Sequence, residues 1–265
     1  MSKLRYVKTL DQVKKAQEEN PEFLKSTVRT IRTVYETDPA VAKAVVPKPL
    51  EPSARPEVHM HVSEITMHIT PDFDMKIGSA IVGVTVDYDD GEGIYLLTMP
   101  MTSEQAVIGG RDTFGEPKKI ADITLERAGD DLVAKVTRMG TTYIELHGRV
   151  GESKGAREIV DHAYCFKAMP SCDQGKALDA DPLLVRLEWQ HEHDSVNAVD
   201  GAEVILRESM FDPVVDLPVR RIVSMEFEEG RTKSNGSVLR SVPGDWLLPF
   251  LHQRYDDMSG DGIEI

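Results

Sequence analysis

The sequence predicts a mostly β protein of the α+β class, built as a large antiparallel β-sheet or β-barrel with peripheral helices. Two observations support this prediction. From Val58 onward, stretches of alternating apolar and polar residues follow one another with few helical patterns between them, which disfavours a parallel βαβ fold. The turn-rich Asp89-Asp90-Gly91-Glu92 separates two such stretches, residues 79–88 and 93–101, as a hairpin would require.

Each expected element has a local signal. A helix is expected at residues 10–19, ended by Asn20-Pro21, and a second at 40–46, where Asp38 can cap and Pro39 fits the first turn. A C-terminal helix is expected at 245–255, bent or divided by Pro249. Strands are expected at residues 26–36, 58–69, 79–88, 93–101, 120–127, 131–138, 141–149, 163–169, 183–193, 202–207 and 219–228. Residues 109–119 are expected to form a glycine-rich loop ended by a proline.

The chain is expected to form one domain over residues 1–265, with a peripheral helix at 1–25 and a short acidic tail at 256–265. Its formal charge of −14 disfavours nucleic acid and anionic lipid, because both are negatively charged. No stretch approaches the ~20 apolar residues of a membrane span, and the charged start lacks the core of a signal peptide. The two cysteines fit a reducing compartment, so a cytoplasmic location is expected.

The adjacent lysines Lys118 and Lys119 are the most unusual local feature, because they follow GRDTFGEP and precede an apolar strand. One interpretation is a solvated pair at a strand edge. The other is an amine nucleophile, which must lose its proton although a free lysine has a pKa near ~10.4. A second ammonium ~7 Å away contributes less than ~2 pKa units. Consecutive strand residues point to opposite faces, so burial is expected to do more than the neighbouring charge.

Several segments resemble the acetoacetate decarboxylase superfamily in the order in which that family has them. They are VYETDPAVAKAVVPKPLEP, GSAIVGVTVDYDDGEGIYLLTMPM, GRDTFGEPKK, FKAMPSCDQGKALDADPLLVRLE and DPVVDLPVRRIVS, and they span residues 34–255 together with the last helix. The resemblance implies a β-barrel-like fold, homo-oligomers and imine chemistry without an organic cofactor. By its place in GEPKK, Lys118 is the implied imine-forming residue, and Lys119 the neighbour that helps to lower its pKa.

The sequence departs from the decarboxylase pattern at positions that would contact the substrate carboxylate. Glu116 stands where those enzymes have tyrosine, and Lys76 where they have glutamate. The expected arginine falls on Val28, with Arg29 and Arg32 nearby. These changes resemble the branch of pyruvate aldolase-dehydratases and hydratases, in which a cation such as Arg29, Arg32 or Lys76 would hold the carboxylate.

Three further side chains are candidates for the site, and two of them have competing interpretations. Glu64 matches the family's other active-site glutamate. Glu116 is either a general acid or base, or one partner of a surface ion pair with Arg111. Tyr255 is either a tyrosine at the edge of the core or the C-terminal tyrosine that reaches the active site in related aldolase-dehydratases.

The favoured function is therefore an imine-forming lyase for a small oxo acid, acting as a pyruvate aldolase-dehydratase, with an aldehyde co-substrate, or as a hydratase. A true acetoacetate decarboxylase is the alternative. A metal-dependent enzyme would use His59-Met60-His61 and His191-Glu192-His193, each of which places two imidazoles on one strand face. Histidines at the edge of the core explain the same pattern without a metal, and no metal ligand is assigned. A non-catalytic binding or oligomerisation module is the remaining class.

Overall fold

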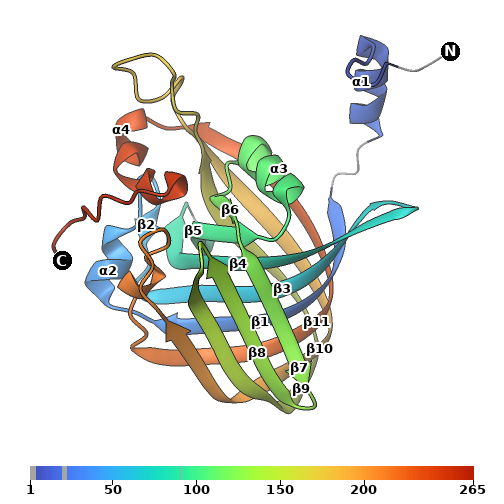
Figure 1. Cartoon of the computed structure of the whole chain (residues 1–265), viewed down its shortest axis with the longest axis vertical. Helices are drawn as coiled ribbons and strands as arrows, with labels where there is room; N and C mark the ends of the chain where they lie inside the picture. The colour runs from blue at the N-terminus through green and yellow to red at the C-terminus, as the bar shows by residue number, and fades with distance from the viewer. Residues whose placement is uncertain (1–3, 20–22, 90) are drawn as a thin grey trace.

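The computed structural model describes residues 4–19, 23–89 and 91–265 (Figure 1). The helices are α1 (Leu10–Glu18), α2 (Pro39–Ala44), α3 (Glu104–Phe114) and α4 (Gly244–Leu247), with 3-10 turns η1 (Val214–Asp216), η2 (Leu248–Phe250) and η3 (His252–Tyr255). The strands are β1 (Leu24–Glu36), β2 (Glu51–Pro52), β3 (Glu57–Thr70), β4 (Phe73–Tyr88), β5 (Gly91–Met101), β6 (Lys118–Ile120), β7 (Asp122–Ala128), β8 (Asp131–Arg138), β9 (Thr141–Lys167), β10 (Leu183–Leu206) and β11 (Arg221–Ser241).

One sheet, with the strand order β6-β5-β4-β3-β1-β11-β10-β9-β8-β7, carries the fold. The sheet closes because β5 also pairs in parallel with β9, where Ile94 lies opposite Ala163. The second half of β5 pairs instead with β6, where Met99 lies opposite Lys118. The strands β5, β4, β3, β1, β11, β10 and β9 thus form a barrel, and β7 and β8 extend the sheet beyond it. The predicted mostly β class with a barrel and peripheral helices is confirmed.

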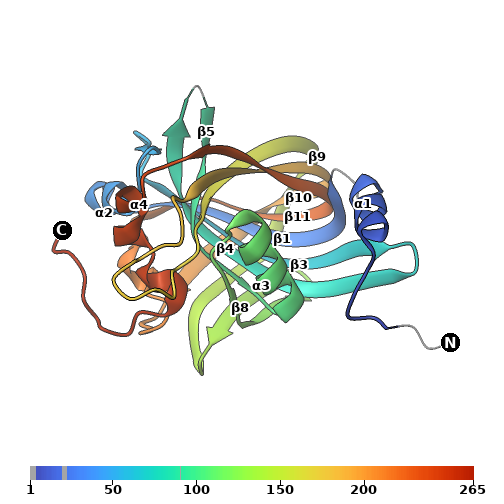
Figure 2. The ribbon, with the colours of Figure 1, turned by 90° about the horizontal axis from the view of Figure 1, so that it is seen from above.

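The two faces of this sheet carry different cores. The outer face packs a large apolar cluster under β8, the C-terminal turns and α2, with Tyr35 and Phe227 fully buried in it. The inner face carries a smaller apolar cluster that includes Leu187 and Trp189. Arg32 on β1 contacts Asp161 on β9, and these strands are not neighbours in the sheet, so this contact crosses the barrel interior. Figure 2 shows the curved strands from above, with α3 near the centre of the view.

Several strands are longer than their apolar patterns predict. The stretches expected at 141–149 and 163–169 fall in β9, which ends at Lys167, and those at 183–193 and 202–207 fall in β10, which ends at Leu206. Strand β11 continues to Ser241. The segments that join these stretches are polar, so the sequence there lacks the apolar alternation by which a strand is predicted. In β9 the ammonium of Lys154 and the guanidinium of Arg157 each lie 2.7 Å from a carboxylate oxygen of Glu226. Charged side chains on these strands are therefore paired across the sheet.

The expected loop at residues 109–119 is wrong, because most of it belongs to helix α3. Ser103 caps this helix by accepting a hydrogen bond from the Ala106 amide at 3.4 Å. The helix ends at Gly115, whose φ of 79° is the left-handed conformation that glycine adopts without steric cost. The expected strand at 120–127 is divided into β6 and β7.

The terminal helices differ in how closely they follow the prediction. Helix α1 forms as expected and none of its residues is buried, whereas Asn20-Pro21 lies outside the described residues. The C-terminal helix is broken into α4, η2 and η3, with Pro249 inside η2, as its proline predicts. Within the described ranges, no helix has the length and apolar character needed to cross a membrane.

Candidate active site

Lys118 and Glu116 form a buried pair at the inner face of the barrel wall. The amine nitrogen of Lys118 lies 2.8 Å from Oε2 of Glu116, and the two residues are 8% and 5% exposed. The partner of Lys118 in β5 is Met99, which belongs to the inner apolar cluster. Burial raises the pKa of the Cys165 thiol, and Glu116 and Lys118 both act on that group, so Cys165 lies close to the pair. The lysine–carboxylate pair is thus shielded from water by apolar side chains.

Gly110 on α3 makes room for this pair. A Cβ at position 110 would lie 2.6 Å from Nζ of Lys118 and would overlap Oε2 of Glu116. The preceding Gly109 has open space around its Cβ position. Helix α3 therefore packs directly on the lysine amine, and only glycine at position 110 allows the approach.

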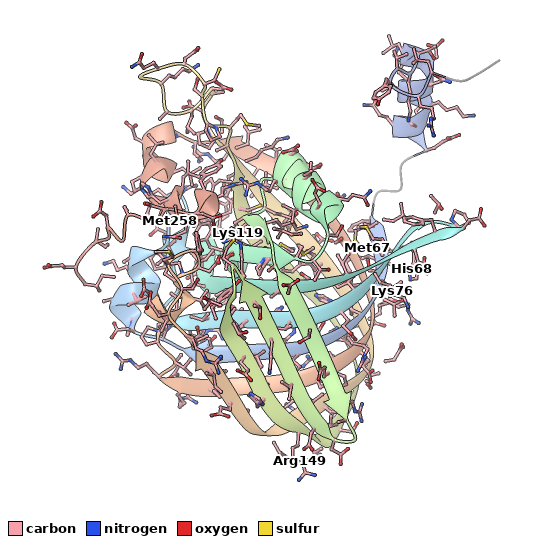
Figure 3. The ribbon with its side chains drawn as sticks, in the orientation of Figure 1. Met67, His68, Lys76, Lys119, Arg149 and Met258 are labelled. Atoms are coloured by element: carbon pink, nitrogen blue, oxygen red, sulfur yellow. The ribbon has the colours of Figure 1, made fainter. Side chains whose placement is uncertain are left out.

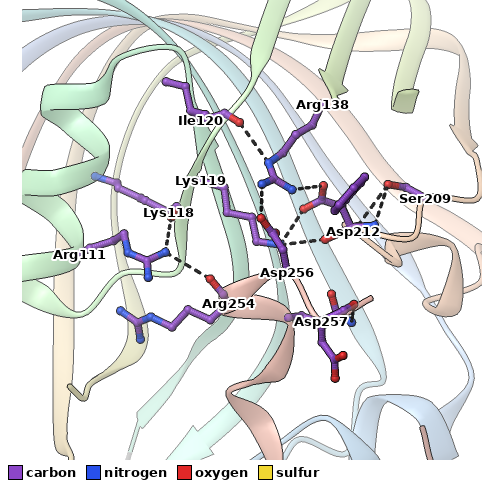
Figure 4. A network of polar contacts seen from close by, with 12 residues as sticks. Arg111, Lys118, Lys119, Ile120, Arg138, Ser209, Asp212, Arg254, Asp256 and Asp257 are labelled. Atoms are coloured by element: carbon purple, nitrogen blue, oxygen red, sulfur yellow. Dashed lines mark hydrogen bonds and ion pairs between the residues drawn. The ribbon is translucent and has the colours of Figure 1, made fainter. Parts of the chain in front are cut away.

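Lys119 points to the opposite face of β6 and enters an ion-pair network (Figure 4). Its amine lies 3.0 Å from Oδ1 of Asp212 and 2.9 Å from Oδ1 of Asp256, and it donates to the carbonyl of Phe211. Arg138 contacts the second oxygen of each carboxylate. Although burial acts in the other direction, hydrogen bonds from Arg138 and Lys119 hold the pKa of Asp256 below its usual value. Two cations and two carboxylates therefore balance one another behind the barrel wall.

Two arginines fasten the segment that carries the pair. Arg111 on α3 donates from Nη1 to the carbonyls of Lys118, at 2.9 Å, and Arg254, at 3.3 Å. Arg254 in η3 donates to the carbonyls of Phe166, at 2.9 Å, and Glu116, at 3.4 Å. The C-terminal turns are thus tied to the backbone of both members of the buried pair.

Arg29, Glu64 and Lys76 line a separate groove of about 480 Å³, together with Gly78 and Thr102. The guanidinium of Arg29 lies 2.7 Å from Oε2 of Glu64 on the neighbouring strand. Figure 3 places Lys76 on the projecting β3–β4 hairpin, away from Lys119. The structure therefore brings these three predicted residues together, but in a groove that neither Lys118 nor Glu116 lines.

Arg32 and Tyr255 have other surroundings. Arg32 faces the barrel interior, where its Nη1 lies 2.8 Å from Asp161 and its Nε donates to Glu228 at 3.1 Å. Tyr255 is 44% exposed, and the guanidinium of Arg111 stacks 5.3 Å from its ring centroid. Tyr255 therefore contacts Arg111, the residue that binds the Lys118 backbone. Glu116 does not pair with Arg111, the ion pair considered from the sequence, but with Lys118.

Both histidine pairs face the barrel interior. The rings of His191 and His193 stack with centroids 5.1 Å apart, and those of His59 and His61 meet edge to face at 6.2 Å. Burial lowers the pKa of His59 and of His193 to about 4. Among the described residues, no group of three or more histidine, cysteine, aspartate or glutamate side chains is arranged to hold a metal ion.

Sequence reasoning missed Gly110, Arg138, Asp212, Arg254 and Asp256 as parts of the site. Their contacts join segments up to 143 residues apart, as in the Arg111–Arg254 hydrogen bond, and no local pattern encodes such pairs. The glycine pair at 109–110 was a usable signal, because a glycine inside a helix that begins at a good cap indicates a close approach.

The chain is similar to known proteins over most of its length. The family model described as acetoacetate decarboxylase (ADC) matches residues 11–242. An acetoacetate decarboxylase of Burkholderia vietnamiensis is 30% identical over 194 residues, which cover 71% of this chain and 76% of that relative. A relative of the same name from Burkholderia cenocepacia is 28% identical over the same shares.

Solved structures share the fold at lower identity. An acetoacetate decarboxylase superposes with a TM-score of 0.72 and 21% identity, covering 88% of this chain and 99% of the other. The enzyme of that name from Legionella pneumophila gives 0.70 and 18%, covering 83% and 88%. The enduracididine biosynthesis enzyme MppR complexed with pyruvate gives 0.69 and 13%, covering 84% and 92%.

Proposed function

Because the chain belongs to the acetoacetate decarboxylase family, we propose that it is a lyase that acts on a small oxo acid through an imine on Lys118. The observation that carries this proposal is the contact of 2.8 Å between the Lys118 amine and the Glu116 carboxylate, buried inside the barrel. A nucleophilic amine needs a group that takes its proton, and a general acid is needed when water leaves. One carboxylate at hydrogen-bond distance supplies both.

Imine formation would proceed by proton exchange within this pair. The Lys118 ammonium gives a proton to Glu116, and the amine attacks the ketone carbon. The former carbonyl oxygen then takes two protons, one from Glu116 and one from the nitrogen, and leaves as water. The nitrogen keeps one proton, so the product is a protonated imine beside an ionised Glu116 carboxylate. That carboxylate is the base required for the next step.

With pyruvate, Glu116 would remove a methyl proton and the imine would become an enamine. The enamine carbon forms a bond to an aldehyde carbon, and the aldehyde oxygen takes the proton from Glu116. A second proton removed from the same carbon returns through Glu116 to the departing hydroxyl, which leaves as water. Hydrolysis of the conjugated imine then frees the product and Lys118. The aldolase-dehydratase reaction is favoured because a carboxylate beside the imine nitrogen can carry every proton that leaves carbon in it.

Decarboxylation of a β-oxo acid is the second candidate, and the names of the curated relatives favour it. The same protonated imine would accept the electron pair when the bond to CO₂ breaks. An ionised Glu116 would repel the substrate carboxylate and so assist its loss. Both candidates need Lys118, and they differ in whether Glu116 acts as a base toward carbon.

Borohydride trapping tests the shared step. Wild type is reduced with pyruvate and, separately, with acetoacetate, and intact mass and peptide mapping then locate the added group. We expect one adduct at Lys118 in the wild type and none in Lys118→Ala. Lys135→Ala is the control and should be labelled fully, because the wild-type Lys135 amine lies on the β8–β9 surface, 3.4 Å from Glu145. A label only on Lys119, or none with any oxo acid, rejects the proposal.

Product analysis decides between the candidates. Acetoacetate is incubated with the enzyme and CO₂ is followed, and pyruvate with an aldehyde is followed by the absorbance of the conjugated product. Condensation without rapid CO₂ release supports the aldolase-dehydratase. Rapid CO₂ release without a condensation product identifies a decarboxylase.

A further inference from the structure

The barrel interior has a polar end that the proposed chemistry does not use. It consists of His61 on β3, His191 and His193 on β10, Arg32 on β1 and Asp161 on β9, and is called here the histidine wall. His61 is 4% exposed and His193 is 3% exposed. Nε2 of His191 lies 3.3 Å from Asp161, but Nε2 of His61, Nδ1 of His191 and Nδ1 of His193 are buried and have no hydrogen-bond partner among the described residues. Buried polar atoms rarely lack partners, so these nitrogens indicate a polar occupant of the interior.

The histidine wall adjoins the apolar cluster around Lys118. In the sheet, Arg32 lies opposite His61, and His61 lies opposite Ile81. Ile81 packs on the same inner cluster as Met99, whose partner in β6 is Lys118. Three strand spacings of ~4.8 Å therefore separate His61 from Lys118, or about 14 Å along the curved wall. On β10 the side chains that face the barrel interior change from apolar at Trp189 to polar at His191.

The charges at the histidine wall are already balanced. Arg32 contacts Asp161 and Glu228, and Arg157 contacts Glu226 and Glu228. An incoming carboxylate would meet carboxylates that already occupy these guanidinium groups, and like charges repel it. The wall is therefore unsuited to a second anionic group.

Neutral imidazoles suit an uncharged ligand instead. Burial lowers the pKa of His61 and His193, so both rings are neutral near pH 7. A neutral imidazole offers one donor and one acceptor, which complement a hydroxyl, an amide or a heteroaromatic nitrogen. The adjoining wall at Ile81 and Trp189 is apolar, so it suits the carbon body of such a ligand.

We propose that the histidine wall is a subsite for the uncharged, hydrogen-bonding end of the second reactant, an aldehyde whose carbonyl carbon reaches the enamine on Lys118. The catalytic role of this subsite rests on the proposed aldol reaction. Its ability to bind a ligand is tested separately. The chain has two tryptophans, Trp189 beside the wall and Trp246, which packs against the outer core. In a Trp246→Phe background, fluorescence therefore reports on Trp189.

The binding test compares three probes of similar size: benzyl alcohol, toluene and benzoate. We expect benzyl alcohol to change Trp189 fluorescence at the lowest concentration and benzoate to bind weakest. His61→Leu should weaken benzyl alcohol about fivefold to tenfold, the loss of one neutral hydrogen bond. His61→Gln, which keeps hydrogen-bonding atoms, should restore part of the affinity. His162→Leu is the matched control. His162 follows Asp161 in β9, so its side chain lies on the opposite face of the sheet, where it contacts Glu188.

The catalytic test uses pyruvate with 4-(hydroxymethyl)-, 4-methyl- and 4-carboxybenzaldehyde. We expect kcat/KM to fall in that order, and His61→Leu to erase the advantage of the hydroxymethyl compound without changing borohydride trapping of pyruvate. If benzyl alcohol binds no better than toluene, or His61→Leu leaves its affinity unchanged, the subsite is rejected. If the probes bind as expected but no aldehyde condenses, the subsite stands and the aldol reaction is rejected.

Discussion

Lys118 and Lys119 are adjacent in the chain, but their side chains end on opposite sides of the barrel wall. Nζ of Lys118 lies 2.8 Å from Glu116 inside the barrel, whereas Nζ of Lys119 lies 3.0 Å from Asp212 outside it. The alternation of side chains along β6 produces this separation. The charge of Lys119 is also matched by two carboxylates, so we expect it to stabilise the wall more than it affects Lys118.

Lys119→Gln is therefore expected to reduce stability more than it changes the chemistry. Removing one partner from a buried ion network costs about 3–5 kcal/mol. The pH midpoint of imine formation should move by less than about one pH unit, because the lost charge was already paired. Urea unfolding and the pH dependence of borohydride trapping measure the two effects. A larger shift of the midpoint with unchanged stability would show that Lys119 acts on Lys118 through its charge.

Gly110→Ala and Gly109→Ala form a matched pair on α3. Both replacements favour the helix by up to about 1 kcal/mol. Only the methyl group at position 110 meets Lys118 and Glu116, with Nζ 2.6 Å from the new carbon. We expect Gly110→Ala to lower turnover about 100-fold, since displacement of a reacting group by ~1 Å has this effect. Gly109→Ala should retain activity, and equal activity in both variants would place the reacting amine elsewhere.

Glu116→Gln should separate imine formation from the later proton transfers. Glutamine keeps the size of the side chain but cannot exchange protons, so condensation with dehydration should fall by about 10²–10⁴-fold. Trapping of pyruvate should fall much less when the reaction is followed to completion. The control is Glu104→Gln, at the exposed start of α3. Equal loss of trapping and condensation would mean that Glu116 is needed only to form the imine.

The buried histidines predict acid sensitivity. Burial lowers the pKa of His59 and His193 to about 4, against about 6.5 in the unfolded chain. Between these values the unfolded state binds more protons, so stability is full above pH ~6.5 and falls as the pH drops toward 4. Each histidine contributes a slope of at most about 1.4 kcal/mol per pH unit. Urea midpoints from pH 7.5 to 4.5 measure the slope, and His193→Asn should reduce it. A flat profile would show that these rings bind protons equally well in the folded and unfolded states, so that their pKa is not lowered.

Some features of the site could be predicted from local sequence, and others could not. Strand alternation predicted the opposite directions of Lys118 and Lys119, and the shared faces of the HxH pairs. The carboxylates that pair with Lys119 come from positions 212 and 256, and nothing near either position marks them as its partners. Residues 151–162 were not predicted as strand because they carry many charged side chains. Basic side chains among them are paired with carboxylates on β11, and a sequence pattern does not show such pairs.

The ion pairs of Asp256 make the C-terminal segment part of the barrel wall, although residues 258–265 are exposed. Residues 256–265 therefore do not behave as one loose tail. Trimming by a carboxypeptidase should pass through 258–265 without effect and become damaging when it removes Asp256, because Lys119 and Arg138 then lose a shared carboxylate. A tag fused after Ile265 should be tolerated for the same reason, whereas one joined directly to Tyr255 should not.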